Sequence, residues 1–326
     1  MSGMEASGRA VWAGGLGVLA VLAAGGAILS RSVSAASLTG LAVVSAGVVA
    51  VLLLGFPARE MGRAIGVAAR STANAEERRR AALVWEAAAR NAWVLSATSA
   101  VVGFVSVLCS DFGGLSRFVS GVGGRATGVA LGVLFAVVFA IPAIRMVPSA
   151  EPPLEAATAP PSWQRLLGGV ALLALLAWPL LTHGKSGQFE PRSWLLNAPA
   201  WLVTAGGTLA LALYLRAIGR GPSVVVGLGA AGTIGVLLGV TRGLHGFATT
   251  SIADVAAGLM FAISSGYAAL AGLAGVGLPL LDGDARQGRR TPAAARCVAY
   301  AFPLAVLAVL ALAVLLVMIP MEKPAG

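Results

Sequence analysis

The side chains that could do chemistry in this chain are mainly hydroxyls, and they lie inside long uncharged stretches. Thr208, Thr233, Ser264 and Ser265 are surrounded by Gly, Ala, Val and Leu residues. A hydroxyl in such surroundings can line a path for an ion, or it can donate to the carbonyl of the preceding turn of its own helix. These four residues are therefore candidate pore-lining residues, with the local hydrogen bond as the alternative for each.

Few other residues suggest a reaction. His183 and His245, and likewise Cys109 and Cys297, lack the spacing of metal ligands or of a disulfide framework. The sequence contains no phosphate-binding loop, no nucleophile elbow and no pair of acids suited to glycosyl transfer. It therefore predicts no enzyme activity, no cofactor and no metal site.

Long uncharged stretches must position the candidate hydroxyls. Nine of them, each 17 to 27 residues long, cover residues 10–30, 32–58, 91–110, 126–144, 166–182, 193–215, 221–241, 255–281 and 297–321. A hydrocarbon core about 30 Å thick needs about 20 apolar residues of helix, and a backbone in lipid must satisfy its own polar groups. The expected fold class is an all-α membrane protein with nine transmembrane helices.

The first stretch resembles a signal peptide, but its 21 residues exceed the usual apolar region of about 7–15. It is therefore counted as a span, and whether it is cleaved stays open.

The net charge of +10 is explained by membrane topology. With the N-terminus inside, 16 of the 23 Lys and Arg residues fall on the cytoplasmic side and 7 on the outer side, as the positive-inside rule requires. We therefore expect a multi-pass protein of a bacterial inner (cytoplasmic) membrane, with its C-terminus outside. Anionic lipid is an expected partner, and nucleic acid is not.

The order of the stretches predicts two parallel four-span repeats. Residues 1–146 form the first and residues 165–282 the second, joined by a Pro-rich cytoplasmic linker at 147–164, and residues 283–326 carry one extra span. The second and sixth stretches align at an offset of 159 residues, although any two Gly/Ala-rich spans share such likeness. The basic segment 59–90 is expected to form a short amphipathic cytoplasmic helix, either solvated or docked on a partner or the membrane surface.

Small residues predict close helix packing in two stretches. The helix-packing candidates are Gly206, Gly207, Gly229, Gly232, Gly235 and Gly239. Glycines on one face let another helix backbone approach closely. Thr233 stands about 100° from Gly232 around a helix, so Thr233 can face a pore while the glycines pack.

Three motifs resemble the MotA/TolQ/ExbB proton-channel family. Residues 200–212 (AWLVTAGGTLALA) are similar to the second span of that family, residues 227–235 (GLGAAGTIG) to its third and residues 256–266 (AAGLMFAISSG) to its fourth. Residues 53–57 and 140–145 resemble the exits of family spans into the cytoplasm. The chain departs from the family in having nine expected spans rather than three or four, and in lacking a large cytoplasmic domain.

The resemblance implies an integral membrane subunit of an ion-driven motor or channel complex, using protons or sodium. Such a subunit is a homo- or hetero-oligomer that forms the wall around a helix of a single-span partner, whose intramembrane aspartate carries the ion. The nine stretches contain no Asp or Glu, so the acid must come from that partner. Two alternatives stay open: a secondary transporter of a small solute and a non-catalytic membrane scaffold subunit.

Opposite membrane sides are predicted for two alanines. Cysteines introduced at Ala75 and Ala325 should react with impermeant thiol reagents from opposite faces, because Ala75 is expected in the cytoplasm and Ala325 outside. Labelling of both from one face would contradict the nine-span topology.

Overall fold

The computed structural model describes residues 35–69, 73–109, 115–146, 159–181, 191–217, 223–287 and 293–318. Within these ranges the chain is helical and has no strand. The elements are α2 (Ala35–Gly55), α3 (Ala58–Ala69), α4 (Ala75–Leu108), α5 (Leu115–Met146), α6 (Ser162–Leu181), α7 (Pro191–Leu195), α8 (Ala198–Ala217), α9 (Ser223–Ala248), α10 (Ile252–Gly272), the π-helical turn η1 (Leu273–Gly277), α11 (Leu278–Arg286) and α12 (Ala293–Met318).

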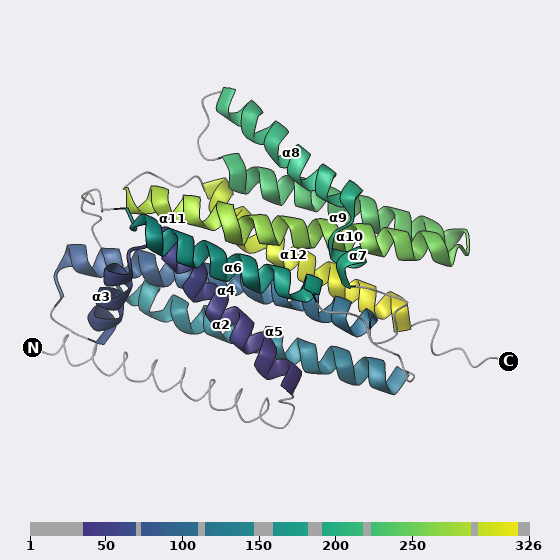
Figure 1. Cartoon of the computed structure of the whole chain (residues 1–326), viewed down its shortest axis with the longest axis horizontal. Coiled ribbons are helices and arrows are strands. Elements are labelled where there is room, and N and C mark those ends of the chain that lie inside the picture. The colour runs from purple at the N-terminus through teal and green to yellow at the C-terminus, as the bar shows by residue number, and fades with distance from the viewer. Residues whose placement is uncertain are drawn as a thin grey trace, which may run out of the picture.

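The long helices have the dimensions and the surface of a multi-pass membrane protein. They lie side by side along the long axis of the molecule (Figure 1). Among the described residues, five helices are long and apolar enough to cross a membrane, and the bent pair α2–α3 makes a sixth. Residues 132–144 of α5 and 162–178 of α6 are shorter apolar helices. The expected span 10–30 lies outside the described residues.

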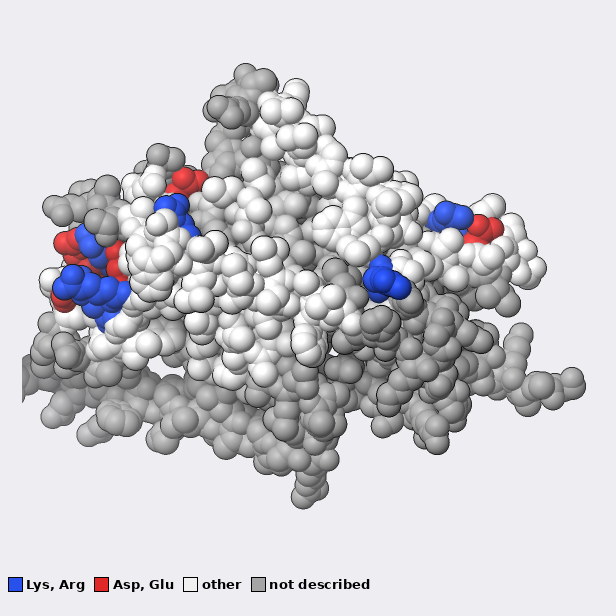
Figure 2. Space-filling view, in the orientation of Figure 1, with Lys and Arg blue, Asp and Glu red and all other residues white. Residues whose placement is uncertain are grey.

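Charge separates to the ends of the molecule. Among the described residues on the face in Figure 2, most charged groups gather at the two ends of the long axis, and those between are uncharged apart from one basic group near α7. Large apolar side chains are exposed on the surfaces of the long helices, among them Leu166 of α6, Leu202 of α8 and Leu237 of α9. Such an apolar surface is costly in water and favourable in lipid.

A bend separates α2 from α3. The two helices turn by 115° across Phe56 and Pro57, where proline removes a backbone donor and restricts the residue before it. Gln164, in the first turn of α6, satisfies the backbone groups left by the break. Its side chain accepts from the N–H of Ala58 at 2.9 Å and donates to the carbonyl oxygens of Leu53 at 3.1 Å and Phe56. Gln164 thereby fixes α6 to the bend.

The basic segment 59–90 differs from the expected single short helix. It divides into α3 and the first half of α4, because Asn74 starts a new helix. The Asn74 side chain accepts from the N–H of Glu77 at 2.7 Å, and the Glu77 side chain accepts from the N–H of Asn74 at 3.3 Å, which is a capping box. α4 then continues for 34 residues, so Arg90 lies midway along a helix rather than in a loop.

Two antiparallel helix pairs build much of the bundle. In the first pair, Trp85 of α4 packs on Phe139 of α5 with ring centroids 5.8 Å apart, and its Nε1 donates to the carbonyl of Ala64 in α3 at 3.2 Å. In the second pair, α9 and α10 approach so closely that a Cβ on Gly239 would lie 2.4 Å from the backbone nitrogen of Ala262. The repeat itself stays a prediction. Its proposed boundaries at 164 and 282 fall inside α6 and α11.

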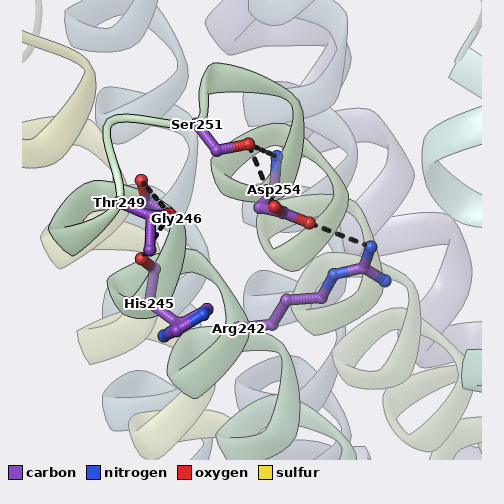
Figure 3. A network of polar contacts seen from close by, with 6 residues as sticks. All are labelled: Arg242, His245, Gly246, Thr249, Ser251 and Asp254. Atoms are coloured by element: carbon purple, nitrogen blue, oxygen red, sulfur yellow. Dashed lines mark hydrogen bonds and ion pairs between the residues drawn. The ribbon is translucent and has the colours of Figure 1, made fainter.

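Polar contacts close the turn between α9 and α10 (Figure 3). Ser251 caps α10, accepting from the N–H of Asp254 at 3.3 Å and donating to its carboxylate at 2.9 Å. Arg242 of α9 reaches the same carboxylate at 3.3 Å. Thr250 adopts a positive φ of 56°, which allows the chain to reverse within three residues.

We predict that Gln164→Leu destabilises the protein by about 1–3 kcal/mol or more. The substitution keeps the bulk of the side chain but leaves the backbone groups of Leu53, Phe56 and Ala58 without their partner in a partly buried place. The free energy of unfolding measured by detergent titration reports the loss. Gln287→Leu is the matched control, because Gln287 is exposed and should change stability little. Equal effects of the two substitutions would contradict the role given to Gln164.

Candidate functional site

Two of the four candidate hydroxyls bond within their own helix. Thr208 donates to the carbonyl of Thr204 at 2.6 Å, and Thr233 donates to the carbonyl of Gly229 at 2.7 Å. Thr233 is exposed on α9. The local hydrogen bond, which the sequence left as the alternative, is therefore the arrangement in this chain for both residues, and Thr233 does not face Ser264 or Ser265.

The two serines of α10 are fully buried and have different surroundings. Ser264 donates to the carbonyl of Leu195 at 2.9 Å and accepts from the N–H of Asn197 at 3.0 Å, so it fixes the link between α7 and α8. Ser265 has no hydrogen-bond partner for its Oγ among the described residues. A Cβ placed on Gly235 would lie only 2.5 Å from that Oγ, so glycine is what leaves room for it.

Thr204 of α8 is a second buried hydroxyl of this kind. It is 1% exposed, and its Oγ1 makes no hydrogen bond within the described part of the chain. Thr204 and Ser265 both lie next to Gly235, because a Cβ on Gly235 would be 3.6 Å from Thr204 Oγ1 as well as 2.5 Å from Ser265 Oγ. Three helices thus bring together two unused hydroxyls at one glycine. Each unpaired hydroxyl costs about 1–3 kcal/mol in a buried place.

The glycine candidates divide between packed and open positions. Gly232 faces Ala269 and Phe302, and Gly229 faces Val298. Gly235 and Gly239 face α10, as described above, and Gly207 faces Ala231 of α9. A Cβ on Gly206 would have no described atom within 4 Å, and Gly206 is exposed on α8. α9 is therefore surrounded by close neighbours on its glycine face, whereas one face of α8 is bare.

An apolar groove of about 550 Å³ opens between α6 and α8. Its floor is the junction of α10 with η1, and its two walls are α6 and α8. Its lining includes Leu173, Leu176, Trp201, Thr204, Tyr267 and Val276. Leu173 and Val276 are more than half exposed, at 67% and 51%, so the groove is open on the outer surface of the bundle. Tyr267 joins floor to wall by donating to the carbonyl of Leu176.

A buried ion pair lies at the charged end of the bundle. Arg90 of α4 is 5% exposed and Asp282 of α11 is 1% exposed, and the guanidinium donates to the Asp282 carboxylate. Glu86, one turn earlier on α4, is a second carboxylate 3.7 Å from Arg90. The pair links residues 192 positions apart in the sequence, and therefore ties the early helices to the end of the α10–α11 segment.

The surroundings of this pair contain polar atoms that no described protein group satisfies. They include Arg90 Nε, Asp282 Oδ2 and both polar atoms of the Asn91 side chain. The backbone of α2 also comes close, because a Cβ on Gly55 would lie 3.0 Å from the Asp282 Cβ. Unsatisfied buried polar groups of this kind are typical places for ordered water or a bound ion.

Sequence reasoning did not identify Thr204, Arg90 or Asp282 as site residues. Arg90 and Asp282 directly flank the uncharged stretches 91–110 and 255–281. Arg90 was assigned to the cytoplasmic segment 59–90, and Asp282 to the end of the second repeat. Opposite charges at the ends of two uncharged stretches were the sequence signal that could have indicated an ion pair between Arg90 and Asp282. Thr204 stands four residues before Thr208 in an apolar run, which places both on one helix face.

The remaining candidates for chemistry are dispersed. His245 lies in the last turn of α9, Cys109 is buried and Cys297 is exposed. Within the described residues no group of three or more His, Cys, Asp or Glu side chains could hold a metal ion.

No protein-family model, curated protein or solved structure matches this chain.

We predict that Arg90→Met lowers the free energy of unfolding by about 3–5 kcal/mol, because it leaves the Asp282 carboxylate buried without a partner. The double substitution Arg90→Met with Asp282→Leu should recover most of that loss. Arg242→Met is the control, since its pair with Asp254 has side chains 57% and 42% exposed and should cost at most about 1 kcal/mol. A double variant as unstable as the single one would show that the pairing is not what stabilises this end.

Proposed function

We propose that this chain is an integral membrane subunit of an ion-driven motor or channel complex, in which it forms part of the wall around an acid-bearing helix of a single-span partner. The groove between α6 and α8, whose lining includes Thr204, a residue with an unpartnered hydroxyl, is the observation that carries the proposal. The resemblance of residues 200–212, 227–235 and 256–266 to the MotA/TolQ/ExbB family supplies the class of complex.

The shape and composition of the groove fit one face of a helix. A helix with its side chains is about 10 Å across, so 550 Å³ takes the side chains from roughly one or two turns. The floor offers small residues, namely Ala268, Ala271, Gly272 and Gly275. Small residues allow the close backbone approach on which helix association in lipid depends.

The hydroxyl gives the groove its chemical preference. Thr204 both lines the groove and keeps a free Oγ1. Rotation between staggered positions about χ1 can turn this oxygen toward an occupant. A protonated carboxyl on a partner helix can then donate to Thr204, or a carboxylate can accept from it. No described Asp or Glu of this chain lines the groove, so the acid belongs to the partner.

A secondary transporter is the second candidate. The π-helical turn η1 interrupts the α10–α11 segment beside the groove, and π turns and broken helices are frequent at transport sites. A transporter must expose its site to each side of the membrane in turn. The two proposals therefore differ in whether the groove binds a protein helix or a solute.

The test is photo-crosslinking from the groove in the native host. A photoreactive residue at Leu173 should crosslink to a membrane-spanning peptide that contains Asp or Glu. The same residue at Leu237, exposed on α9 outside the groove, is the control and should not crosslink to that peptide. Crosslinks from Leu173 to lipid alone, or to a soluble protein, would contradict the proposal.

Thr204→Val separates partner binding from folding. Valine keeps the shape and removes a hydroxyl that has no partner within the described chain, so stability should be unchanged or slightly higher. The yield of the Leu173 crosslink should nevertheless fall several-fold. Thr208→Val removes a hydroxyl that is satisfied within its own helix, and it should leave the yield near normal. An unchanged yield with Thr204→Val would remove the hydroxyl from the proposal.

A further inference from the structure

Arg286 is a buried cation without a partner among the described residues. It lies in the last turn of α11 and is 7% exposed. Its Nε and Nη1 are buried and make no hydrogen bond. The nearby carboxylate of Asp282 already accepts from Arg90, and Glu60 of α3 acts on Arg286 only through its charge. No hydrogen bond or ion pair joins Arg286 to another described residue.

The buried N–H donors of Arg286 need an acceptor. Arginine keeps its proton in proteins, and a buried charged group whose donors lack acceptors is strongly unfavourable. Glu60 and Asp282 act on Arg286 through their charges, but neither accepts from its buried Nε and Nη1, so these donors are available to an acceptor outside the described chain. Arg165, in the first turn of α6, is a basic residue whose charge acts on Arg286. Its side chain is exposed and is available to the same anion.

The position along the bundle indicates which anion. Arg286 lies five residues beyond the uncharged stretch 255–281, which is about 7–8 Å along a helix. Arg165 directly precedes the uncharged stretch 166–182. Both guanidinium groups therefore belong at the level of lipid headgroups on the cytoplasmic side. Basic pockets between transmembrane helices at this level bind anionic headgroups, and arginine binds phosphate oxygens through two parallel hydrogen bonds.

We propose that Arg286, together with Arg165, binds the phosphate group of an anionic phospholipid between α11 and α6. The phosphate then accepts from the Arg286 donors that have no hydrogen-bond partner among the described residues. This site is at the opposite end of α11 from the groove, and it does not depend on the function proposed above. A small rotation of Glu60 toward Arg286 is the rival arrangement, and free phosphate ion is the rival source of the anion.

The test compares lipid binding by the purified full-length protein and its variants. Native mass spectrometry counts retained phosphatidylglycerol and phosphatidylcholine, and thermal unfolding in detergent measures stabilisation by each lipid and by inorganic phosphate. The unsubstituted protein should retain phosphatidylglycerol in preference to phosphatidylcholine. Arg286→Gln should weaken phosphatidylglycerol binding about tenfold or more, and Arg165→Gln less. Arg242→Gln, at the other end of the bundle, should leave binding unchanged.

Three outcomes would overturn the proposal. Equal retention of phosphatidylglycerol by Arg286→Gln and the unsubstituted protein would exclude the site. Stabilisation by inorganic phosphate that equals stabilisation by phosphatidylglycerol would assign the site to the free ion. Destabilisation by Glu60→Gln that matches Arg286→Gln, with lipid retention unchanged, would identify Glu60 as the partner. If Arg286→Gln does not fold, Arg286→Lys keeps the charge without the planar fork, and the proposal requires weakened but measurable retention.

Discussion

The arrangement of this protein depends on the need to satisfy polar groups where water is excluded. A straight helix meets that need by itself, but a broken helix or a buried charge does not. At the α2–α3 bend, the backbone groups freed around Pro57 are satisfied by the side chain of Gln164 from α6. At the end of α10–α11, the charge of Asp282 is satisfied by Arg90 of α4. Both solutions join segments more than 100 residues apart in the sequence, so meeting a local requirement also determines which helices are neighbours.

Where the requirement is not met within the described chain, the unsatisfied groups indicate partners. Thr204 and Ser265 keep unpartnered hydroxyls beside Gly235, and Arg286 keeps two unpartnered nitrogens in the last turn of α11. The apolar groove lies beside the first set, and the exposed Arg165 accompanies the second. These two places differ in chemistry, since one offers hydroxyls in an apolar wall and the other offers positive charge. A partner helix suits the first, and a phosphate group suits the second.

The sequence was informative about the helices and less informative about their contacts. The uncharged stretches correctly indicated an all-helical chain of membrane character within the described residues, because hydropathy follows from single residues. They did not reveal that α4 extends back to Ala75, since its start depends on the reciprocal hydrogen bonds of Asn74 and Glu77. The hydroxyl of Thr233 was considered for a pore, but it donates to Gly229. Helical periodicity shows which residues share a face, whereas the neighbour of that face depends on packing between distant segments, as the pair of Arg90 with Asp282 shows.

The most direct test of the central claim is the structure of the native complex, purified from its host membrane and determined by electron cryomicroscopy. The groove between α6 and α8 should contain a helix of another polypeptide that contacts Leu173 and Val276, with an acidic side chain within hydrogen-bonding distance of Thr204. A complex in which the groove contains only lipid, or in which the chain has no protein partner, would contradict the account.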